Sequence, residues 1–306
     1  MNYTVINKSR GNHGHQIKDW LGGYVAGKAL GLNYFHTEYD YLDYFIPKSY
    51  FNSIQNLKNN EEVHVRGHEP SGHMDGFDEY NDFNNFMSKF NEKKLSENNL
   101  VVFSNAFRLH PFQTIPWFKN GDISRDLFLE TCKELEDAFY IDKEKKTSDE
   151  KIIVAIHANF YRNDGGDSFR PRFRFGLEYY TNIISQISES ISNKKVEFHI
   201  YTEKAGSHEI SNEFKNKDQC FVHVGSNRQK RNYEQINHIF KDFVDADILV
   251  CSNSSFSVVA SYYRNSKNKV TIYHPHLHLN HLPEYNYIAA DVNGVLSSHS
   301  SLKIFN

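Results

Sequence analysis

One short segment near the end of the chain combines residues that could bind an anion. Residues 247–263 read DILVCSNSSFSVVASYY, which predicts a buried strand, a turn rich in hydroxyl groups and an apolar helix. The turn at 252–255 offers hydroxyl and backbone N–H donors, and the N-terminus of the helix adds a favourable dipole. An ordinary N-cap would have the same composition, because Ser and Asn cap helices in many proteins. A site for a phosphate-bearing ligand is therefore one of two interpretations, and two other segments favour it.

A second segment, HANFYRNDGGDSFRPRFR at 157–174, gathers cations and carboxylates after an expected strand at 152–156. Arginine makes paired hydrogen bonds to phosphate, and a carboxylate beside it could take a proton from an attacking hydroxyl. A surface loop held by salt bridges would carry the same residues. Ligands of parallel sheets bind beyond the carboxyl ends of the strands, which favours the functional interpretation. The candidate residues are His157, Arg162, Asp164, Asp167 and Arg170.

The elements that must position these residues alternate regularly from residue 151 onwards. Strands are expected at 151–160, 196–203, 221–225, 247–252 and 269–275, with helices at 177–191, 233–246 and 256–264. Such alternation predicts a parallel sheet flanked by helices, as in a Rossmann-like domain. The loops that should then converge on one site follow Ile156, Thr202, Gly225, Ser252 and Tyr273.

The N-terminal part of the chain predicts a similar opening. The expected elements are a strand at 3–6, a glycine-rich loop at 10–16, a helix at 17–30 that ends at Gly31, and a strand at 32–37. The glycines lack the GxGxxG spacing of a dinucleotide fingerprint, so binding of NAD or FAD is not expected. Residues 48–100 read as irregular with helical patches near 79–91, followed by a strand at 101–107 and an amphipathic helix at 123–140.

Length and charge limit the class of protein. The length of 306 residues suits two domains. The formal net charge of −3 gives no basic field that would attract nucleic acid. The charge-rich run KEKKTSDEK at 143–151 marks the expected boundary, giving domains at 1–148 and 149–306.

The cysteine content and the hydropathy of the chain indicate which cellular compartment the protein occupies. No apolar run approaches the roughly 20 residues that span a bilayer, so no transmembrane segment is expected. The start of the chain lacks the pattern of a signal peptide. The three cysteines, Cys132, Cys220 and Cys251, are far apart and odd in number, which favours a reducing compartment over a disulfide framework. We therefore expect a soluble cytoplasmic protein that is not secreted.

Three segments, in order along the chain, resemble the GT-B fucosyltransferase-like superfamily of α1,2- and α1,6-fucosyltransferases and protein O-fucosyltransferases. RGNHGHQIKDWLGGYVAGKALGL at 10–32 is similar to the family's opening loop and small-residue helix. AIHANFYRNDGGD at 155–167 is similar to its HxRRGD motif, and the helix after it also matches. The most specific likeness is between SNSSFSVV at 252–259 and the family's SNSSFSWW segment. Residues 45–145 are unmatched, as expected for a region that is specific to the acceptor.

The resemblance implies an α/β protein of GT-B fold, with two Rossmann-like domains facing across a cleft and the nucleotide-sugar donor held mainly by the C-terminal domain. It implies inverting transfer by direct displacement, with neither a metal nor a cofactor. In that scheme Arg162 neutralises the departing diphosphate, and His157 lies near the base or ribose. The other donor-binding residues that it implies are Ser252, Ser254, Ser255 and Phe256 in the nucleotide pocket, and Asn12, Gly14 and His15 across the cleft.

The sequence departs from the family pattern at two places that concern the donor. The paired arginines that directly follow the family's histidine are replaced by residues 158–160, so Arg162, or an arginine further on such as Arg170, must serve the phosphates. The acid that many GDP-fucose enzymes use to accept from guanine falls at Ile239, with His238 and Asp242 as its neighbours. A UDP-sugar such as UDP-xylose is therefore left open beside GDP-fucose.

Carboxylates for catalysis and acceptor binding come from two regions. Asp167 stands ten residues after His157, the offset at which some α1,6 members place a carboxylate, so it is our first candidate for general base and Asp164 is the second. Pairing with arginine would lower the pKa of such an acid and weaken it as a base. The candidates for binding acceptor hydroxyls, or for supplying the base from the N-terminal domain, are Glu69, Asp75 and Asp78.

Histidines cluster at two places, and metal binding is one interpretation of them. In YHPHLHLNHLP, alternate spacing would put His274, His276 and His278 on one face of an extended segment. Zinc sites more often show helical i,i+4 pairs or CxxC elements. Hydrogen bonds to sugar hydroxyls or to loop carbonyls are the favoured use, and no metal is expected.

Taken together, the sequence predicts a glycosyltransferase that moves a sugar, fucose or another such as xylose, from a nucleoside diphosphate donor to a glycan hydroxyl. A soluble bacterial or viral enzyme of glycan assembly would fit. The alternative is a catalytically inactive nucleotide- or glycan-binding protein of the same fold.

Overall fold

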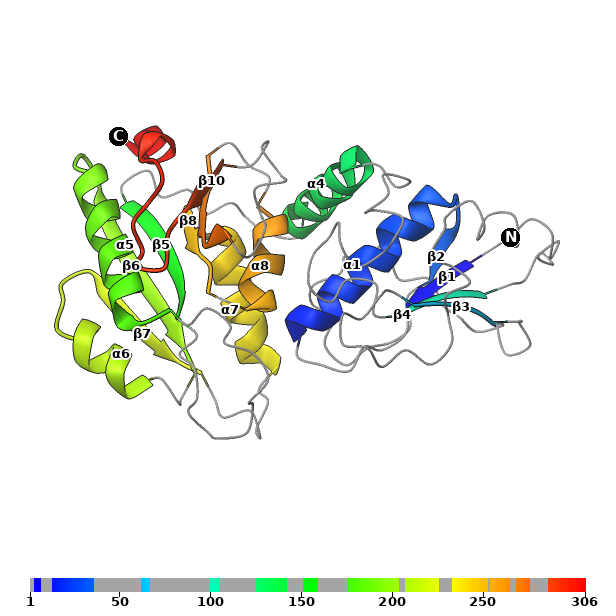
Figure 1. Ribbon diagram of the computed structural model, residues 1–306, viewed down its shortest axis with the longest axis horizontal. Helices are drawn as coiled ribbons and strands as arrows, with labels where there is room; N and C mark the ends of the chain where they lie inside the picture. The colour runs from blue at the N-terminus through cyan, green and yellow to red at the C-terminus, as the bar shows by residue number, and fades with distance from the viewer. Residues whose placement is uncertain are drawn as a thin grey trace. The chain divides into compact units, whose positions relative to one another are not determined.

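The computed structural model describes residues 3–6, 13–35, 62–66, 100–104, 125–141, 151–158, 175–203, 207–225, 233–252, 254–264, 268–275 and 286–306. The chain divides into two compact units, Met1–Asp142 and Lys143–Asn306. Each unit contains a parallel β-sheet with helices packed against it (Figure 1). The α/β fold class expected from the sequence is therefore confirmed.

In the described part of the first unit, four strands form a parallel sheet in the order β2-β1-β4-β3. The strands are β1 (Tyr3–Ile6), β2 (Asn33–Phe35), β3 (Glu62–Arg66) and β4 (Leu100–Ser104), and the helices are α1 (His13–Ala29) and α4 (Arg125–Ile141). Helix α1 buries Trp20, whose ring stacks on Tyr24 at 5.3 Å between centroids. Gly31 ends the helix with a φ of +66°, a conformation that glycine adopts without steric cost.

Two details of this unit differ from the expectation. Strand β3 lies inside the region 48–100 that the sequence had indicated as irregular, because the alternation of valines in EVHVR is only five residues long. Helix α1 begins at His13 rather than at Ile17, so the end of the expected glycine-rich loop is helical. Gly14, in the first turn, is buried.

The described part of the second unit holds a parallel sheet of six strands in the order β10-β9-β8-β5-β6-β7. The strands are β5 (Lys151–Ala158), β6 (Lys195–Thr202), β7 (Cys220–Val224), β8 (Ile248–Val250), β9 (Val270–Tyr273) and β10 (Asn286–Ala289). The helices are α5 (Leu177–Ser190), α6 (Ser207–Phe214), α7 (Tyr233–Asp245) and α8 (Ser255–Tyr262), with the 3-10 turn η7 (Ser300–Phe305) near the C-terminus. The alternation that the sequence predicted is present, and α6, β10 and η7 are additional to it.

The direction of the chain through this sheet changes once. From β5 the chain moves outward through β6 to the edge strand β7, and it then returns to the other side of β5 and continues through β8, β9 and β10. Since parallel crossovers are right-handed, the two directions place their helices on opposite faces. Accordingly α5 and α6 cover one face, while α7 and α8 lie side by side on the other (Figure 1).

A buried arginine fixes α7 to the sheet. Arg264 is 2% exposed, and its guanidinium donates to the carbonyls of Phe243, Val244 and Ala246 at the end of α7 at 2.6–3.0 Å. It also donates to the carbonyls of Asp247 and Val270, at the starts of β8 and β9. A cation at the C-terminus of a helix also interacts favourably with the helix dipole. This side chain therefore ties the end of α7 to the starts of β8 and β9.

Candidate functional site

The candidate site lies where the direction of the second sheet changes. Strands β5 and β8 are neighbours, with Ile156 paired to Val250, and their outgoing connections run in opposite directions. Just beyond these positions, His157 Nδ1 and Ser252 Oγ are 2.9 Å apart and share a hydrogen bond. Open α/β sheets bind ligands at such a switch point, beyond the carboxyl ends of the strands. The two residues thus join the two halves of the sheet at the edge where a ligand is expected.

The imidazole of His157 is held in an apolar environment. Its ring lies 5.2 Å from the ring of Phe243 and 6.2 Å from that of Phe256. Burial lowers the pKa of His157 to about 4. The ring is therefore neutral at pH 7, with one nitrogen as a donor and the other as an acceptor. The Nδ1 nitrogen makes the hydrogen bond with the hydroxyl of Ser252, whose side chain is fully buried.

The start of α8 has the geometry of a helix N-terminus with a serine cap. Ser254 has extended backbone angles, φ −135° and ψ 132°, and its Oγ accepts a hydrogen bond from the Phe256 N–H at 3.3 Å. The N–H of Ser254 donates to the carbonyl of Ser252 at 2.7 Å, which closes the turn. Ser254 is therefore an N-cap, as the simpler interpretation of the sequence had it. The first N–H groups of a helix have no intrahelical partner, and one serine hydroxyl satisfies only part of them.

Aromatic rings form an apolar wall beside this turn. Phe256, in the first turn of α8, contacts Phe240 at 5.5 Å and Phe243 at 5.8 Å between ring centroids. Both partners come from α7 and are fully buried, whereas Phe256 is partly exposed. An accessible ring next to hydroxyl and N–H donors could pack against a planar base or a sugar.

Helix α7 carries an amide without a partner near this wall. Both side-chain amide atoms of Asn237 are buried, and among the described residues neither has a hydrogen-bond partner. Helix α7 follows β7 and so begins at the carboxyl edge of the sheet, which puts Asn237 one turn nearer that edge than Phe240. An unpaired buried amide costs roughly 1–3 kcal/mol, and a ligand with both a donor and an acceptor could remove that cost.

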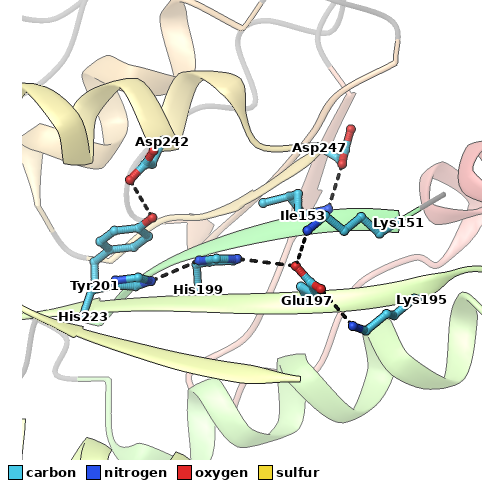
Figure 2. Close-up of polar contacts among 9 residues, drawn as sticks. All are labelled: Lys151, Ile153, Lys195, Glu197, His199, Tyr201, His223, Asp242 and Asp247. Atoms are coloured by element: carbon cyan, nitrogen blue, oxygen red, sulfur yellow. Dashed lines mark hydrogen bonds and ion pairs between the residues drawn. The ribbon is translucent and has the colours of Figure 1, made fainter. Parts of the chain in front are cut away.

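A tyrosine and an aspartate connect α7 to β6. The Tyr201 hydroxyl donates to Asp242 Oδ2 at 2.8 Å (Figure 2). The ring of Tyr201 meets that of Phe243 edge to face, with 5.2 Å between centroids. Burial and the Asp242 carboxylate raise the pKa of Tyr201, so the phenol stays protonated. Asp242, one of the two polar neighbours of Ile239, is thus already engaged within the protein.

The candidate residues from the sequence fall into three groups. His157, Ser252, Ser254 and Phe256 lie together at the carboxyl edge, and Ser255 is the first residue of α8. His238 lies on α7 with an exposed side chain, and Gly14 and His15 are helical residues of α1 in the other unit. The remaining candidates lie outside the described residues, and they are Asn12, Glu69, Asp75, Asp78, Arg162, Asp164, Asp167 and Arg170.

Three residues of the site were missed by sequence reasoning, namely Tyr201, Asn237 and Phe243. The helical spacing of α7 could have indicated the inward face that carries Asn237, Phe240 and Val244. Contacts between α7 and β6 have no signature in a single sequence.

Metal binding and membrane insertion can both be judged on the described residues. Within the residues that are described, no group of three or more His, Cys, Asp or Glu side chains could hold a metal ion. His274 is buried against Phe175, with 5.4 Å between ring centroids, and burial lowers its pKa. The other two histidines of that alternating set, His276 and His278, lie outside the described residues. No helix in the described parts of the chain is both long and apolar enough to cross a bilayer.

Comparisons with known proteins gave matches only among solved structures. No family model and no curated protein matches the chain. POFUT1 in its apo form is 13% identical at a TM-score of 0.49, with 89% of this chain and 97% of that chain covered. FUT1 of Arabidopsis thaliana, solved in complex with GDP, is 13% identical at a TM-score of 0.48, and the match covers 86% of this chain and 69% of FUT1. NodZ α-1,6-fucosyltransferase, co-crystallised with GDP, is 12% identical at a TM-score of 0.42, with 96% and 97% covered.

These similarities concern the path of the backbone, because the sequence identities are only 12–13%.

Proposed function

We propose that this protein is a glycosyltransferase that moves a sugar from a nucleoside diphosphate donor to a glycan hydroxyl. The sugar is fucose or another, such as xylose, and the donor nucleotide is GDP or UDP. The observation that carries the proposal is the His157–Ser252 hydrogen bond of 2.9 Å, at the switch point of the sheet and directly before the N-terminus of α8. A diphosphate suits this edge, because helix N–H groups and serine hydroxyls there can donate to its oxygens.

The surroundings of that hydrogen bond fit the rest of a nucleotide. The partly exposed ring of Phe256 offers an apolar surface to a base or ribose, and the unpaired amide of Asn237 offers one donor and one acceptor. The neutral imidazole of His157 can exchange one further hydrogen bond with a ligand hydroxyl or base. In this proposal the C-terminal unit binds the donor, and the N-terminal unit binds the acceptor.

The chemistry follows the family that the motifs resemble. The acceptor hydroxyl attacks the anomeric carbon, the bond to the diphosphate oxygen breaks, and the sugar is transferred with inversion. Asp167, or else Asp164, takes the hydroxyl proton, and Arg162 compensates the charge that develops on the diphosphate. Because an arginine performs that task, neither a metal nor another cofactor is required.

A catalytically inactive binding protein of the same fold is the second candidate, and one observation favours it. In the alignment of His157 with the HxRRGD motif, the places of the paired arginines hold Asn159 and Phe160, so neither carries an arginine. A protein that had lost a phosphate-neutralising arginine would keep the nucleotide site and lose turnover.

A transfer assay separates the two candidates. The protein is incubated with GDP-fucose or UDP-xylose and a mixture of glycans as acceptors, with and without EDTA, and the release of nucleoside diphosphate is measured. We expect release from one donor that is insensitive to EDTA, and its loss in Arg162→Gln and Asp167→Asn at unchanged melting temperature. Nucleotide binding without any release would favour the inactive protein. A protein that neither binds a nucleotide nor consumes a donor would contradict both candidates.

A further inference from the structure

A row of four rings stands on the α7 side of the sheet, over β6 and the edge strand β7. The rings follow in the order Phe221, His199, His223 and Tyr201, with centroids 5.1, 5.2 and 4.6 Å apart and planes within 25° of parallel. Alternate residues of a strand share a face, so His199 lies on the same side as Tyr201, which contacts α7. Phe221 is 44% exposed, so the row runs from solvent at β7 to the buried contact with α7. Figure 2 shows the other three rings, His199, His223 and Tyr201.

The two histidines in the row are hydrogen-bonded to each other. His199 Nδ1 and His223 Nε2 are 3.0 Å apart. Such a contact is a hydrogen bond only if one nitrogen carries a proton and the other does not. A neutral pair meets this condition, and so does a pair with one extra proton. A pair with two extra protons has two donors facing each other, so the bond is lost and the charges repel.

The charges around the pair are unevenly distributed. Glu197 Oε2 lies 3.9 Å from His199 Nε2, but that carboxylate also binds Lys151 at 2.7 Å and Lys195 at 3.0 Å. From α7, Asp242 faces His223 and accepts from Tyr201. One proton on His199 can therefore be stabilised by Glu197, whereas a second, on His223, faces an imidazolium and a carboxylate that Tyr201 already engages.

Contacts run without a gap from the pair to the candidate site. His223 stacks on Tyr201, whose hydroxyl and ring contact Asp242 and Phe243 of α7. The ring of Phe243 in turn packs on His157. Repulsion between His199 and His223 would act on Tyr201 first, and through Tyr201 on the part of α7 that packs against His157.

We propose that the His199–His223 pair is a proton-operated clasp, closed while it holds at most one extra proton and opened by the second, which loosens edge strand β7 and the contact of Tyr201 with α7. Acidification then weakens ligand binding at His157 and Ser252. The ligand half of this inference rests on the proposed function, whereas the opening of the clasp does not.

The direction of the pKa shifts agrees with a closed clasp at neutral pH. Burial lowers the pKa of both His199 and His223, and each is lowered despite the opposing charge of Asp242. A histidine whose folded pKa lies below its unfolded value destabilises the protein as the pH falls below the unfolded value. The clasp therefore predicts a loss of stability on acidification, beginning near pH 6.5.

The test replaces both rings by groups that keep the hydrogen bond but do not titrate. Asn places an amide near the position of Nδ1, and Gln places one near Nε2, so the variant is His199→Asn with His223→Gln. We expect the melting temperature of the unchanged protein to fall between pH 7.5 and pH 5.0 by at least about 4 °C more than that of the variant. His208→Gln, on the exposed surface of α6, is the control and should retain the full pH dependence. Equal pH dependence in the unchanged protein and the double variant would overturn the clasp.

Two further measurements keep the result clear. If the double variant does not fold, nitrogen NMR of the unchanged protein shows whether the two imidazoles titrate as one coupled pair. Two independent titrations, each near pH 6.5, would overturn the clasp.

The affinity for GDP and UDP is then measured at pH 7.5 and 5.5. On acidification the affinity of the unsubstituted protein should fall at least about fivefold more than that of the double variant, a free energy well within the usual range of coupling between sites. Equal losses would overturn the coupling to the site, and the absence of nucleotide binding at pH 7.5 would instead contradict the proposed function.

Discussion

At the scale of single residues, the protonation state of His157 determines how much positive charge this side chain brings to the candidate site. The ring is neutral when the protein is folded, because burial holds its pKa near 4, against 6.5 for an unperturbed imidazole. A neutral ring leaves the positive charge needed by a diphosphate to other groups, which is consistent with the role proposed for Arg162. His157 itself is then a hydrogen-bonding group that joins β5 to β8.

His157 should make stability depend on pH with a definite sign. Between about pH 6.5 and pH 4 the unfolded chain binds a proton that the folded protein does not, so stability falls as the pH is lowered through that range. His157→Asn keeps a polar group near Ser252 without titrating, and it should reduce this fall by up to about 3 kcal/mol. Urea unfolding of both proteins at pH 7 and pH 4.5 measures the difference. Parallel losses in the two proteins would show that the ring is already charged in the folded state.

Arg264 is the residue whose loss should be most harmful to the fold around the site. Its guanidinium serves five backbone carbonyls from α7, β8 and β9. Arg264→Leu would leave these buried acceptors without their donor, and we expect a cost of about 3–5 kcal/mol, at the upper end for single substitutions. Urea unfolding at pH 7 checks this, with Lys303→Leu on the exposed C-terminal turn as the control. A cost below about 1 kcal/mol would mean that water or a neighbour replaces the guanidinium.

At the scale of elements, the start of α8 has two uses that can be separated. The Ser254 hydroxyl caps the helix, and loss of such a cap costs about 1 kcal/mol. Ser254→Ala should therefore lower stability by about that amount, and it should also weaken nucleotide binding if the same turn holds phosphate. Ser300→Ala in the exposed turn η7 is a matched control for the chemical change. A loss of stability with unchanged nucleotide affinity would reduce the turn to an ordinary N-cap.

Helix α7 offers a sharper distinction, because its Asn237 should have opposite effects on stability and binding. The amide is buried without a partner within the described part of the chain, so Asn237→Leu should leave the free protein as stable or more stable. The same change should weaken nucleotide binding about tenfold, through the loss of one or two hydrogen bonds. Melting temperature and calorimetric titration of one preparation measure both effects. Asn212→Leu on α6 serves as the control, and a destabilised variant with normal affinity would contradict the assignment.

The elements were also where sequence reasoning succeeded and where it failed. Strands and helices of the second unit were predictable because their apolar residues repeat with periods of 2 and 3.6, and the convergence of Ser252 and His157 follows from parallel strands ending at one edge. Short elements such as β3 and β10 were missed, because four or five residues carry little periodicity. The unpaired amide of Asn237 and the pairing of Tyr201 with Asp242 depend on how α7 packs, which local patterns do not encode.

At the scale of the whole molecule, two units with parallel sheets suit an enzyme that must bind two substrates. The described site belongs entirely to the second unit, and its hydroxyls, neutral imidazole and aromatic wall fit a nucleotide. The residues proposed to bind the acceptor, Glu69, Asp75 and Asp78, belong to the first unit. Under the proposed function, donor affinity and acceptor affinity belong to different parts of the chain, so substitutions in one should leave the other unchanged.

The central claim is that the edge formed by His157, Ser252 and α8 binds a nucleoside diphosphate, and calorimetric titration tests it most directly. GDP and UDP are titrated into the unchanged protein, into Ser252→Ala, and into the control Ser188→Ala on the opposite face of the sheet, where the serine donates to the carbonyl of Ile184. We predict that one of the two nucleotides binds, that Ser252→Ala weakens its binding at least about tenfold, equivalent to 1.4 kcal/mol, and that Ser188→Ala does not. Binding of neither nucleotide, or equal affinity in all three proteins, would contradict the claim.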